Sequence, residues 1–294
     1  MPANLEERGL PMALTHELET TDLKLPSVTV VVPAYNEGER LPAFLEQLAR
    51  IGLAYGRPTV ELIVVDDGSS APHTERYGRA VFDAVGVLRA ARSAHTVRLL
   101  TSPGNQGKGA AIRRGWEAAS PRSDWLGFVD ADGAVCPAEF WRLAAMLAPD
   151  APFDVLCGSR VLMAGRSIRR SQFRHVQGRI FATLVEYWFR LGFYDTQCGV
   201  KFVRARALRL VRSRLRERGW LLDVEMLTLL NRAGARAVEE PIDWADPGGS
   251  KVRFGIDPAR MLLGLWRMHR RLAAGYDDAQ GPAAPSSGAA VRRK

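Results

Sequence analysis

The chain has 294 residues, of which 47% are apolar, so it is long enough for one large α/β domain or two small ones with a sizeable core. This composition excludes a disordered chain. Lysine and arginine outnumber aspartate and glutamate by 41 to 32, which gives a formal net charge of +9 and favours anionic partners. Nucleic acid, phosphorylated substrates and an anionic membrane surface all fit that charge, and charge alone does not choose among them.

The cysteine usage and the amino-terminal segment both bear on the cell compartment. The three cysteines are odd in number and widely spaced, with no CxxC pair that would suggest zinc binding or redox chemistry. Such cysteines are typical of the reducing cytosol. Residues 1–26 contain acids and prolines but no continuous apolar stretch, so the sequence shows no secretory signal. We therefore expect a cytoplasmic protein.

No segment predicts a membrane-spanning helix. The most apolar stretch, residues 180–193, is interrupted by Glu186 and Arg190 and falls short of the roughly 20 apolar residues that a spanning helix needs. Near helical spacing, this region carries apolar and aromatic residues at Phe181, Leu184, Tyr187, Trp188, Leu191 and Phe193. Such a stripe predicts a core-facing helix, and it is also compatible with a peripheral contact at the inner face of a membrane.

Strand and helix patterns alternate along the first half of the chain. Short β-branched or apolar runs predict strands at residues 28–32, 62–65, 97–100, 125–129 and 155–157. Helical patterns lie between and after them, at residues 41–53, 75–88, 109–119, 138–147, 173–191, 205–215, 222–233 and 258–269. This alternation favours an α/β fold with a mostly parallel central sheet and helices on both faces.

The residues directly after the first four expected strands are unusually polar. They are residues 33–37 (PAYNE), 66–70 (DDGSS), 102–109 (SPGNQGKG) and 130–133 (DADG). In a parallel sheet the ligand site forms beyond the carboxyl ends of the strands, so these segments predict a binding site. The glycine-rich segment has neither the spacing of a Walker loop nor the third glycine of the dinucleotide fingerprint, but Lys108 at a helix start can face a nucleotide.

Asp130 and Asp132 occupy alternate positions after an apolar strand, so in extended geometry both carboxylates point to one side of the chain. Two hard oxygen ligands on one side suit Mg²⁺ or Mn²⁺, with substrate phosphate oxygens completing the shell. The alternative interpretation is a polar turn or a helix cap.

A second pair of carboxylates follows the expected strand at residues 62–65. An aspartate at such a position accepts hydrogen bonds from a base imide or from ribose hydroxyls, and Asp66 is the better ligand candidate. Asp67 precedes a glycine and is also explained as the start of a turn.

Four segments, in this order and each after an expected strand, resemble the family 2 glycosyltransferases of the GT-A fold: residues 30–37 (VVVPAYNE), 65–69 (VDDGS), 105–109 (NQGKG) and 130–132 (DAD). Further segments look like the dolichyl-phosphate β-glucosyltransferase branch of the polyprenyl-phosphate glycosyltransferases: residues 195–202 (DTQCGVKF), 220–225 (WLLDVE) and 249–251 (GSK). The likeness covers about residues 27–255 of the chain.

The resemblance implies an inverting hexosyltransferase that moves a hexose, glucose in particular, from a UDP-sugar to a polyprenyl phosphate. It places the nucleotide-sugar site on Pro33, Tyr35, Asn36, Glu37, Asp66, Asp67, Gly68, Lys108, Asp130 and Ala131. The metal falls to Asp130 and Asp132, and the catalytic residues are Asp132, Asp223 and Lys251. Lys251 and Arg253 lie in a glycine-flanked loop that can close over the donor.

The acceptor half is rich in arginine. A phosphate acceptor is largely dianionic at neutral pH, because its second pKa lies near 6, so it needs positioning by cations rather than a base. We assign this task to Arg160, Arg169, Arg170, Arg174 and Arg179, whose alternative interpretation is a solvated basic face. A sugar hydroxyl acceptor would instead need a base, for which we prefer Asp223 over Glu225, a residue also explained by the helix dipole.

The sequence thus divides into a flexible segment at residues 1–26, a glycosyltransferase domain at residues 27–272 and a disordered tail at residues 273–294. Within the domain, residues 27–133 form the nucleotide-sugar half and residues 134–272 the acceptor half. The alternatives are transfer to a soluble or polysaccharide hydroxyl, and a nucleotide-sugar sensor, which the intact metal pair argues against. A nucleic-acid-binding module is disfavoured, because basic and aromatic residues do not interleave on a recognisable reader motif.

Overall fold

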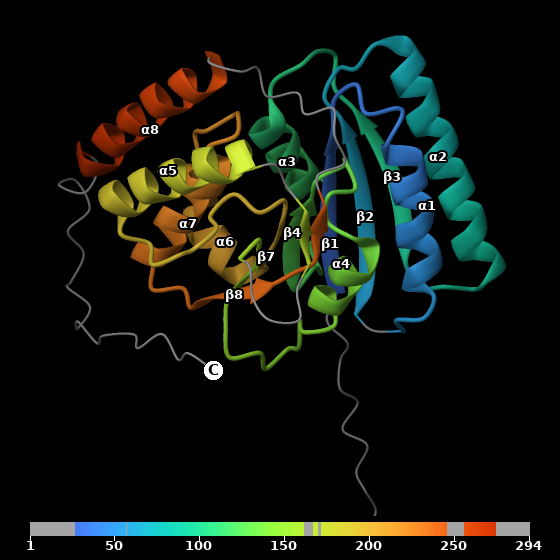
Figure 1. Cartoon of the computed structure of the whole chain (residues 1–294). Coiled ribbons are helices and arrows are strands. Elements are labelled where there is room, and N and C mark those ends of the chain that lie inside the picture. Colours follow the sequence, from blue (N-terminus) through green and yellow to red (C-terminus); the bar gives the residue numbers. More distant parts are fainter. Residues whose placement is uncertain (1–26, 57, 162–166, 170–171, 246–255, 275–294) are drawn as a thin grey trace, which may run out of the picture.

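The computed structural model describes residues 27–56, 58–161, 167–169, 172–245 and 256–274, and a seven-stranded sheet runs through its centre (Figure 1). The strand order is β3–β2–β1–β4–β7–β5–β8. The strands are β1 (Ser27–Ala34), β2 (Thr59–Asp66), β3 (Thr96–Thr101), β4 (Trp125–Val129), β5 (Val155–Ser159), β7 (Val200–Arg204) and β8 (Ala237–Pro241). A small second sheet pairs β6 (Ile168–Arg169) with β9 (Trp244–Ala245).

The sheet is mostly parallel, as the alternation of strands and helices predicts. β1 pairs in parallel with β2 and β4, and β2 pairs in parallel with β3. β7 is the exception, because it runs antiparallel to both of its neighbours, β4 and β5. β8 then continues in parallel beside β5. The carboxyl ends of β1 to β5 therefore lie along one edge of the sheet.

Helices cover both faces of the sheet, as predicted (Figure 1). One face carries α1 (Leu41–Gly52), α2 (Ala71–Ala90) and α4 (Pro137–Ala144). The other carries α3 (Lys108–Glu117), α5 (Gln172–Phe189), α6 (Ala205–Val211), α7 (Leu222–Arg232) and α8 (Ile256–Ala274). A hydrophobic core lies on each face of the sheet: the first core under α1, α2 and α4, and the second core under the other helices. Val30 and Val32 of β1 point into the first core and Val31 into the second, because successive side chains of a strand alternate between faces.

All five predicted strands are present, as β1 to β5. β4 has the predicted bounds, and the other four strands are one to three residues longer than predicted at one or both ends. β7 and β8 are not among the predicted strands. The first residues of β7 belong to the motif at residues 195–202, and β8 lies between the predicted helices at residues 222–233 and 258–269. The helix at residues 205–215 is shorter than predicted, because α6 gives way to a 3₁₀ turn at Arg212–Arg214.

The apolar stripe of α5 mostly faces the core. Leu191 is buried, and Phe181, Trp188 and Phe193 pack against the second core, whereas Tyr187 is 77% exposed. Among the described residues, no helix has both the length and the apolar character needed to cross a membrane. Of the segments predicted to be flexible or disordered, residues 1–26 and 275–294 lie outside the described residues, whereas residues 273–274 of the predicted tail form the end of α8.

Candidate functional site

The four polar segments after β1 to β4 contact one another at the carboxyl edge of the sheet. The segment after β1 is hydrogen-bonded to the segment after β2. The side-chain oxygen of Asn36 accepts a hydrogen bond from the Ser70 backbone amide (3.0 Å), and the backbone amide of Asn36 donates to the Ser69 hydroxyl (2.9 Å). Glu37 forms an ion pair with Arg40 at the start of α1. The expected convergence of these segments is therefore present in the fold.

Asp66 and Asp67, which follow β2, accept hydrogen bonds from different partners. The two oxygens of Asp66 accept from the Ser69 amide (2.9 Å) and the Thr74 hydroxyl (2.6 Å), so this carboxylate holds its own turn. The two oxygens of Asp67 accept from the amides of Gln106 (2.9 Å) and Gly107 (2.8 Å). Asp67 thus fixes the loop that leads into Lys108, a role that the turn interpretation did not foresee.

Gly68 allows the second and third polar segments to meet. Its φ of 72° lies in the left-handed region that favours glycine, and a Cβ there would lie 2.4 Å from the backbone of Gly104. The sequence marked Gly68 as a nucleotide-binding residue, and the structure gives it a close backbone contact with the Gly104 loop.

The first turn of α3 is clamped by the loop that precedes α7. The Ala110 amide donates a hydrogen bond to the Arg218 carbonyl (3.0 Å), and a Cβ on Gly107 would approach that carbonyl oxygen to 2.5 Å. On the other side of the same loop, buried Glu225 accepts hydrogen bonds from the amides of Arg216 and Glu217 (2.8 to 3.0 Å). Glu225 therefore holds this loop against the helix that carries Lys108, beyond any effect of the helix dipole.

Lys108 forms an ion pair with Asp130, the first aspartate of the DAD segment. Its Nζ lies 2.7 Å from Asp130 Oδ1 and 5.4 Å from the centre of the Phe128 ring. Burial acts to lower the pKa of Lys108, but the charges of Asp130, Asp223 and Asp132 outweigh it and raise the pKa overall. Lys108 is therefore a cation at neutral pH, placed where parallel strands end.

Gly199 sets the position of Asp130 from the opposite side. The Asp130 amide donates a hydrogen bond to the Gly199 carbonyl (2.8 Å), and a Cβ on Gly199 would lie 2.5 Å from Asp130 Oδ2. A glycine is therefore needed at position 199, because the segment 195–202 passes so close to Asp130 that a side chain would not fit.

Asp132 lies two residues further on and has no cation within ion-pair distance among the described residues. Its Oδ1 accepts a hydrogen bond from the Ala134 amide (3.0 Å). Burial, followed by the neighbouring charge of Asp130, raises the pKa of Asp132. The charges of Arg40 and Lys108 lower the pKa of Asp132 and offset this rise only in part, so a further cation beside the two carboxylates would favour their charged forms.

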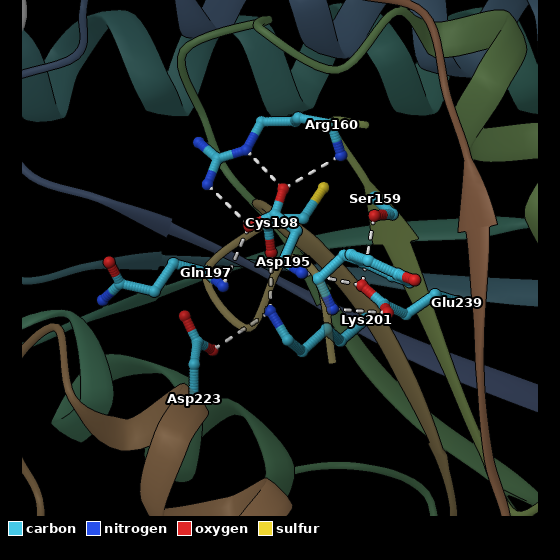
Figure 2. Close-up of polar contacts among 9 residues, drawn as sticks. Ser159, Arg160, Asp195, Gln197, Cys198, Lys201, Asp223 and Glu239 are labelled. Carbon is cyan, nitrogen blue, oxygen red and sulfur yellow. Dashed lines mark hydrogen bonds and ion pairs between the residues drawn. The ribbon is translucent and has the colours of Figure 1, made fainter. Parts of the chain in front are cut away.

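β7 and α7 bring together a buried lysine and a buried aspartate (Figure 2). Lys201 is fully buried; its Nζ donates to the Cys198 carbonyl (2.7 Å) and lies 3.7 Å from Asp223 Oδ1. Asp223 Oδ1 is buried and has no hydrogen-bond partner among the described residues. Burial raises the pKa of Asp223, against the effect of Lys201 and Lys108, which lower it.

Arg160, which follows β5, is held by Asp195 (Figure 2). Two guanidinium nitrogens donate to the two oxygens of Asp195 (2.7 and 2.8 Å), and the Arg160 amide donates as well (2.9 Å). Burial acts to raise the pKa of Asp195, but Arg160 overcomes it and lowers the pKa to about 2. The charge of Arg160 is thus matched within the protein, which leaves less of it for an acceptor phosphate.

A cavity of about 300 Å³ opens beside this pair, between α5 and the ends of β5 and β7. Its walls carry both guanidinium and aromatic groups, from Arg160, Val161, Gly178, Arg179, Phe181, Ala182, Tyr194, Asp195, Thr196 and Gln197. Arg160 and Arg179 are the two predicted acceptor arginines that line it. This cavity has the mixed lining of a site for a group that is anionic at one end and apolar at the other.

The remaining predicted residues fall in several places. Tyr35 is 41% exposed at the edge of the site, Pro33 pairs with Val65 inside the sheet, and Ala131 is buried in the first core, so contacts from it would come from its backbone. Arg170, Lys251 and Arg253 lie outside the described residues, as do the side chains of Arg169 and Arg174.

Sequence reasoning did not single out Lys201, Gly199 or the Glu225 contacts. Lys201 and Gly199 lie within a quoted motif, so the motif contained the signal but not the partner. The contacts of Glu225 join residues through the fold, and spacing alone did not reveal them.

The family model described as Glycosyl transferase family 2 matches residues 29–212 of the chain. A dolichyl-phosphate beta-glucosyltransferase of Drosophila melanogaster is 36% identical over 267 residues, covering 82% of this chain and 77% of that protein. A Homo sapiens protein of the same name is 32% identical over 272 residues, covering 85% of this chain and 80% of the relative.

Solved structures share the fold at lower identity. Glucosyl-3-phosphoglycerate synthase of Mycobacterium tuberculosis matches with a TM-score of 0.57 at 17% identity, covering 83% of this chain and 81% of that one. A complex of that enzyme with Mn²⁺, UDP-glucose and phosphoglyceric acid matches with a TM-score of 0.56 at 18% identity, covering 89% and 86% of the two chains. This likeness shows the GT-A fold.

Proposed function

Because the chain belongs to glycosyl transferase family 2, we propose that it transfers glucose, with inversion, from UDP-glucose to a polyprenyl phosphate of the dolichyl type. The names of the Drosophila melanogaster and Homo sapiens relatives support the sugar and the acceptor. The observation that carries the proposal is the Lys108–Asp130 ion pair beside Asp132, at the edge where the polar segments meet. This arrangement offers a cation and two carboxylates to a nucleoside diphosphate.

The two aspartates fit a divalent cation, Mg²⁺ or Mn²⁺. Asp130 and Asp132 present hard oxygen ligands, and burial together with the charge of Asp130 raises the pKa of Asp132, so a bound cation would favour its charged form. No group of three or more acidic, histidine or cysteine side chains with metal-site geometry occurs among the described residues, so substrate oxygens would complete the shell. A bound ion would stabilise the charge that develops on the departing diphosphate.

The protein's own residues provide the rest of the donor site. Lys108, held as a cation by Asp130, can stabilise charge on the diphosphate of the leaving UDP. Asp67 orients the loop before Lys108 through two backbone amides. Asp66, with Tyr35 and Glu37 nearby, lies at the edge where a uridine would be held, and the base and ribose offer it hydrogen-bond donors.

On the acceptor side, the proposal needs no general base. The phosphate oxygen attacks the anomeric carbon as the bond from that carbon to UDP breaks, and a dianionic phosphate has no proton to lose. Arg179, an exposed residue that also lines the cavity, is the described arginine best placed to orient it, because Arg160 is committed to Asp195. The apolar walls of the cavity suit the first isoprene units of the lipid.

A second candidate is transfer to a soluble or polysaccharide hydroxyl, with Asp223 as the base. One observation favours it: Asp223 Oδ1 is buried without a hydrogen-bond partner among the described residues, so it can accept a proton from a hydroxyl. Asp223→Asn separates the two candidates. Transfer to a phosphate should survive this change at a tenth of the wild-type rate or better, whereas transfer to a hydroxyl should fall by a factor of about 10² to 10⁴.

The first experiment measures UDP or GDP release from a panel of UDP- and GDP-sugars, with Mn²⁺ or Mg²⁺, with and without polyprenyl phosphate. Turnover of UDP-glucose that requires the lipid phosphate and a divalent ion supports the proposal. Donor binding without any response to the lipid phosphate refutes the lipid acceptor and leaves the hydroxyl candidate. The proposal also assigns residues 27–133 to the donor and residues 134–272 to the acceptor, in a cytoplasmic enzyme that reaches its lipid at the inner face of a membrane.

A further inference from the structure

Exposed apolar residues gather on α5 and α8. These two helices carry five of the twelve large hydrophobic residues that are exposed among the described residues: Ile180, Tyr187, Leu262, Leu263 and Trp266. The other seven are distributed singly over loops, strands and other helices, as is normal for a soluble surface. A concentration of this kind on two neighbouring helices needs a separate explanation.

The two helices lie side by side and run in the same direction, with their carboxyl ends together (Figure 1). His269 of α8 stacks on Trp188 of α5 at 6.0 Å and meets Phe189 edge-on at 5.8 Å between ring centroids. These contacts define which side of each helix faces the other. They also fix the pair as one surface rather than two independent helices.

The inner side of α8 packs on the second core. Leu265, Met268 and Leu272 are buried there, and Gly264 approaches Leu221 so closely that a Cβ would lie 2.6 Å from that side chain. At 3.6 residues per turn, Leu262 and Trp266 lie next to His269 around the helix, on the side away from the core. By the same spacing, Ile180 and Tyr187 lie on the outer side of α5 next to α8. The exposed apolar residues of both helices thus share the outer face of the pair.

This outer face is also basic. Arg179 of α5, Arg190 directly after α5, and Arg260, Arg267 and Arg270 of α8 are exposed, against one exposed acid, Glu186, among the side chains that the structure describes here. The guanidinium of Arg270 lies 5.0 Å from the centre of the Trp266 ring, which pairs an apolar ring with a cation at the surface. A helix with apolar residues bordered by arginines is typical of proteins that lie in the interface of an anionic bilayer.

We infer that the outer face of α5 and α8 binds the surface of an anionic lipid bilayer. Leu262, Leu263 and Trp266 would enter the boundary between headgroups and acyl chains, and the arginines would contact the anionic headgroups. The inference rests on the proposed function for its physiological meaning, because a lipid-linked acceptor is presented at such a surface. Arg179 joins the two, since it is exposed on α5 and also lines the cavity.

The test measures co-sedimentation of the full chain with vesicles that contain no polyprenyl phosphate. Vesicles of phosphatidylcholine with phosphatidylglycerol should bind the wild-type chain at least tenfold more tightly than phosphatidylcholine alone, and added salt should weaken the binding. The double variant Leu263→Gln/Trp266→Gln should bind at least tenfold more weakly. Arg267→Gln/Arg270→Gln should lose about fivefold for each arginine.

Phe82→Gln on α2 and Leu210→Gln on α6 are matched controls, since these residues are 75% and 68% exposed on other elements. Both controls should bind vesicles as the wild type does. Equal binding to neutral and anionic vesicles, or an equal loss in the controls, would overturn the inference. Thermal unfolding of each variant checks that the fold is intact.

A second measurement keeps this inference apart from the proposed function. Transfer of glucose to a short-chain, water-soluble polyprenyl phosphate, without vesicles, should be unchanged in Leu263→Gln/Trp266→Gln, because these residues touch neither the cavity nor the aspartates. If the wild-type chain binds anionic vesicles but transfers nothing, the proposed acceptor fails and the docking surface stands. If the chain transfers glucose to the soluble polyprenyl phosphate but does not bind anionic vesicles, the docking surface fails and the proposed acceptor stands.

Discussion

The segments after β1 to β4 and the segments after β5 use charged residues in different ways. In the first region, acids and backbone amides contact one another across loops: Asp67 holds the Gln106 and Gly107 amides, and Asp130 holds Lys108. In the second region, Arg160 is bound by Asp195, while the arginines of α5 and α8 lie on the surface. The number of arginines therefore says little about which of them meets an acceptor, because the fold already pairs one of them, Arg160, with Asp195.

The largest effect should follow from removing the second aspartate of the DAD segment. Asp132→Ala should lower kcat for transfer by at least about 10³-fold, which is roughly 4 kcal/mol, because the proposed divalent ion would lose a ligand. The thermal unfolding midpoint should stay within a few degrees, because the group has no ion pair among the described residues. Asp150→Ala, an exposed acid in a turn, is the control and should leave kcat unchanged. Turnover at the wild-type rate in Asp132→Ala would refute the metal role.

Gly199→Ala tests whether the segment before β7 sets the position of Asp130. Its Cβ would lie 2.5 Å from Asp130 Oδ2, so Asp130 and Lys108 must shift. We expect activity to fall about 100-fold, or roughly 2.7 kcal/mol of transition-state stabilisation. Gly86→Ala on α2, where a Cβ would meet nothing within 4 Å, should cost no activity. Activity within twofold of the wild type would show that Asp130 tolerates displacement.

The Arg160–Asp195 pair should appear in the pH dependence of stability. Because the pKa of Asp195 falls from 3.8 to about 2 on folding, its contribution is complete above about pH 4 and is lost as the pH falls toward 2. Asp195→Asn should therefore be less stable than the wild type by roughly 2 kcal/mol at pH 5, and the difference should shrink toward pH 2. Urea unfolding across this range measures it. A difference that stays constant with pH would mean that this carboxylate is not the titrating group.

The smallest effect should come from weakening the contact of Asp67 with the loop before Lys108. Asp67→Asn keeps one acceptor oxygen and loses the other, so the Gln106–Gly107 turn should loosen. We expect KM for UDP-glucose to rise about tenfold, near 1.4 kcal/mol, with a smaller change in kcat. Asp83→Asn on α2, whose side chain is 59% exposed, is the control and should leave KM unchanged. A larger loss of kcat than of KM in Asp67→Asn would assign this residue to the chemical step instead.

The sequence was most informative where function and local pattern coincide. Strand ends follow from β-branched runs, and parallel topology brings their carboxyl ends together, so the meeting of residues 33–37, 66–70, 102–109 and 130–133 was predictable. It was least informative where partners come from distant segments. The contact of Gly199 with Asp130 and of Lys201 with Asp223 depends on β7 entering the sheet antiparallel, which no local pattern indicates. Likewise, the partner of Arg160 is a carboxylate 35 residues away.

β7 also limits how the molecule can move. It is hydrogen-bonded to β4 on one side and to β5 on the other, so a single ladder joins the proposed donor and acceptor halves. A hinge between the halves would break that ladder, whereas loops can move without disturbing it. Substrate entry and product release should therefore proceed by local loop opening over a fixed floor. Amide hydrogen exchange should accordingly be slow in β4, β5 and β7 with or without UDP, and should change in the loop at residues 215–221.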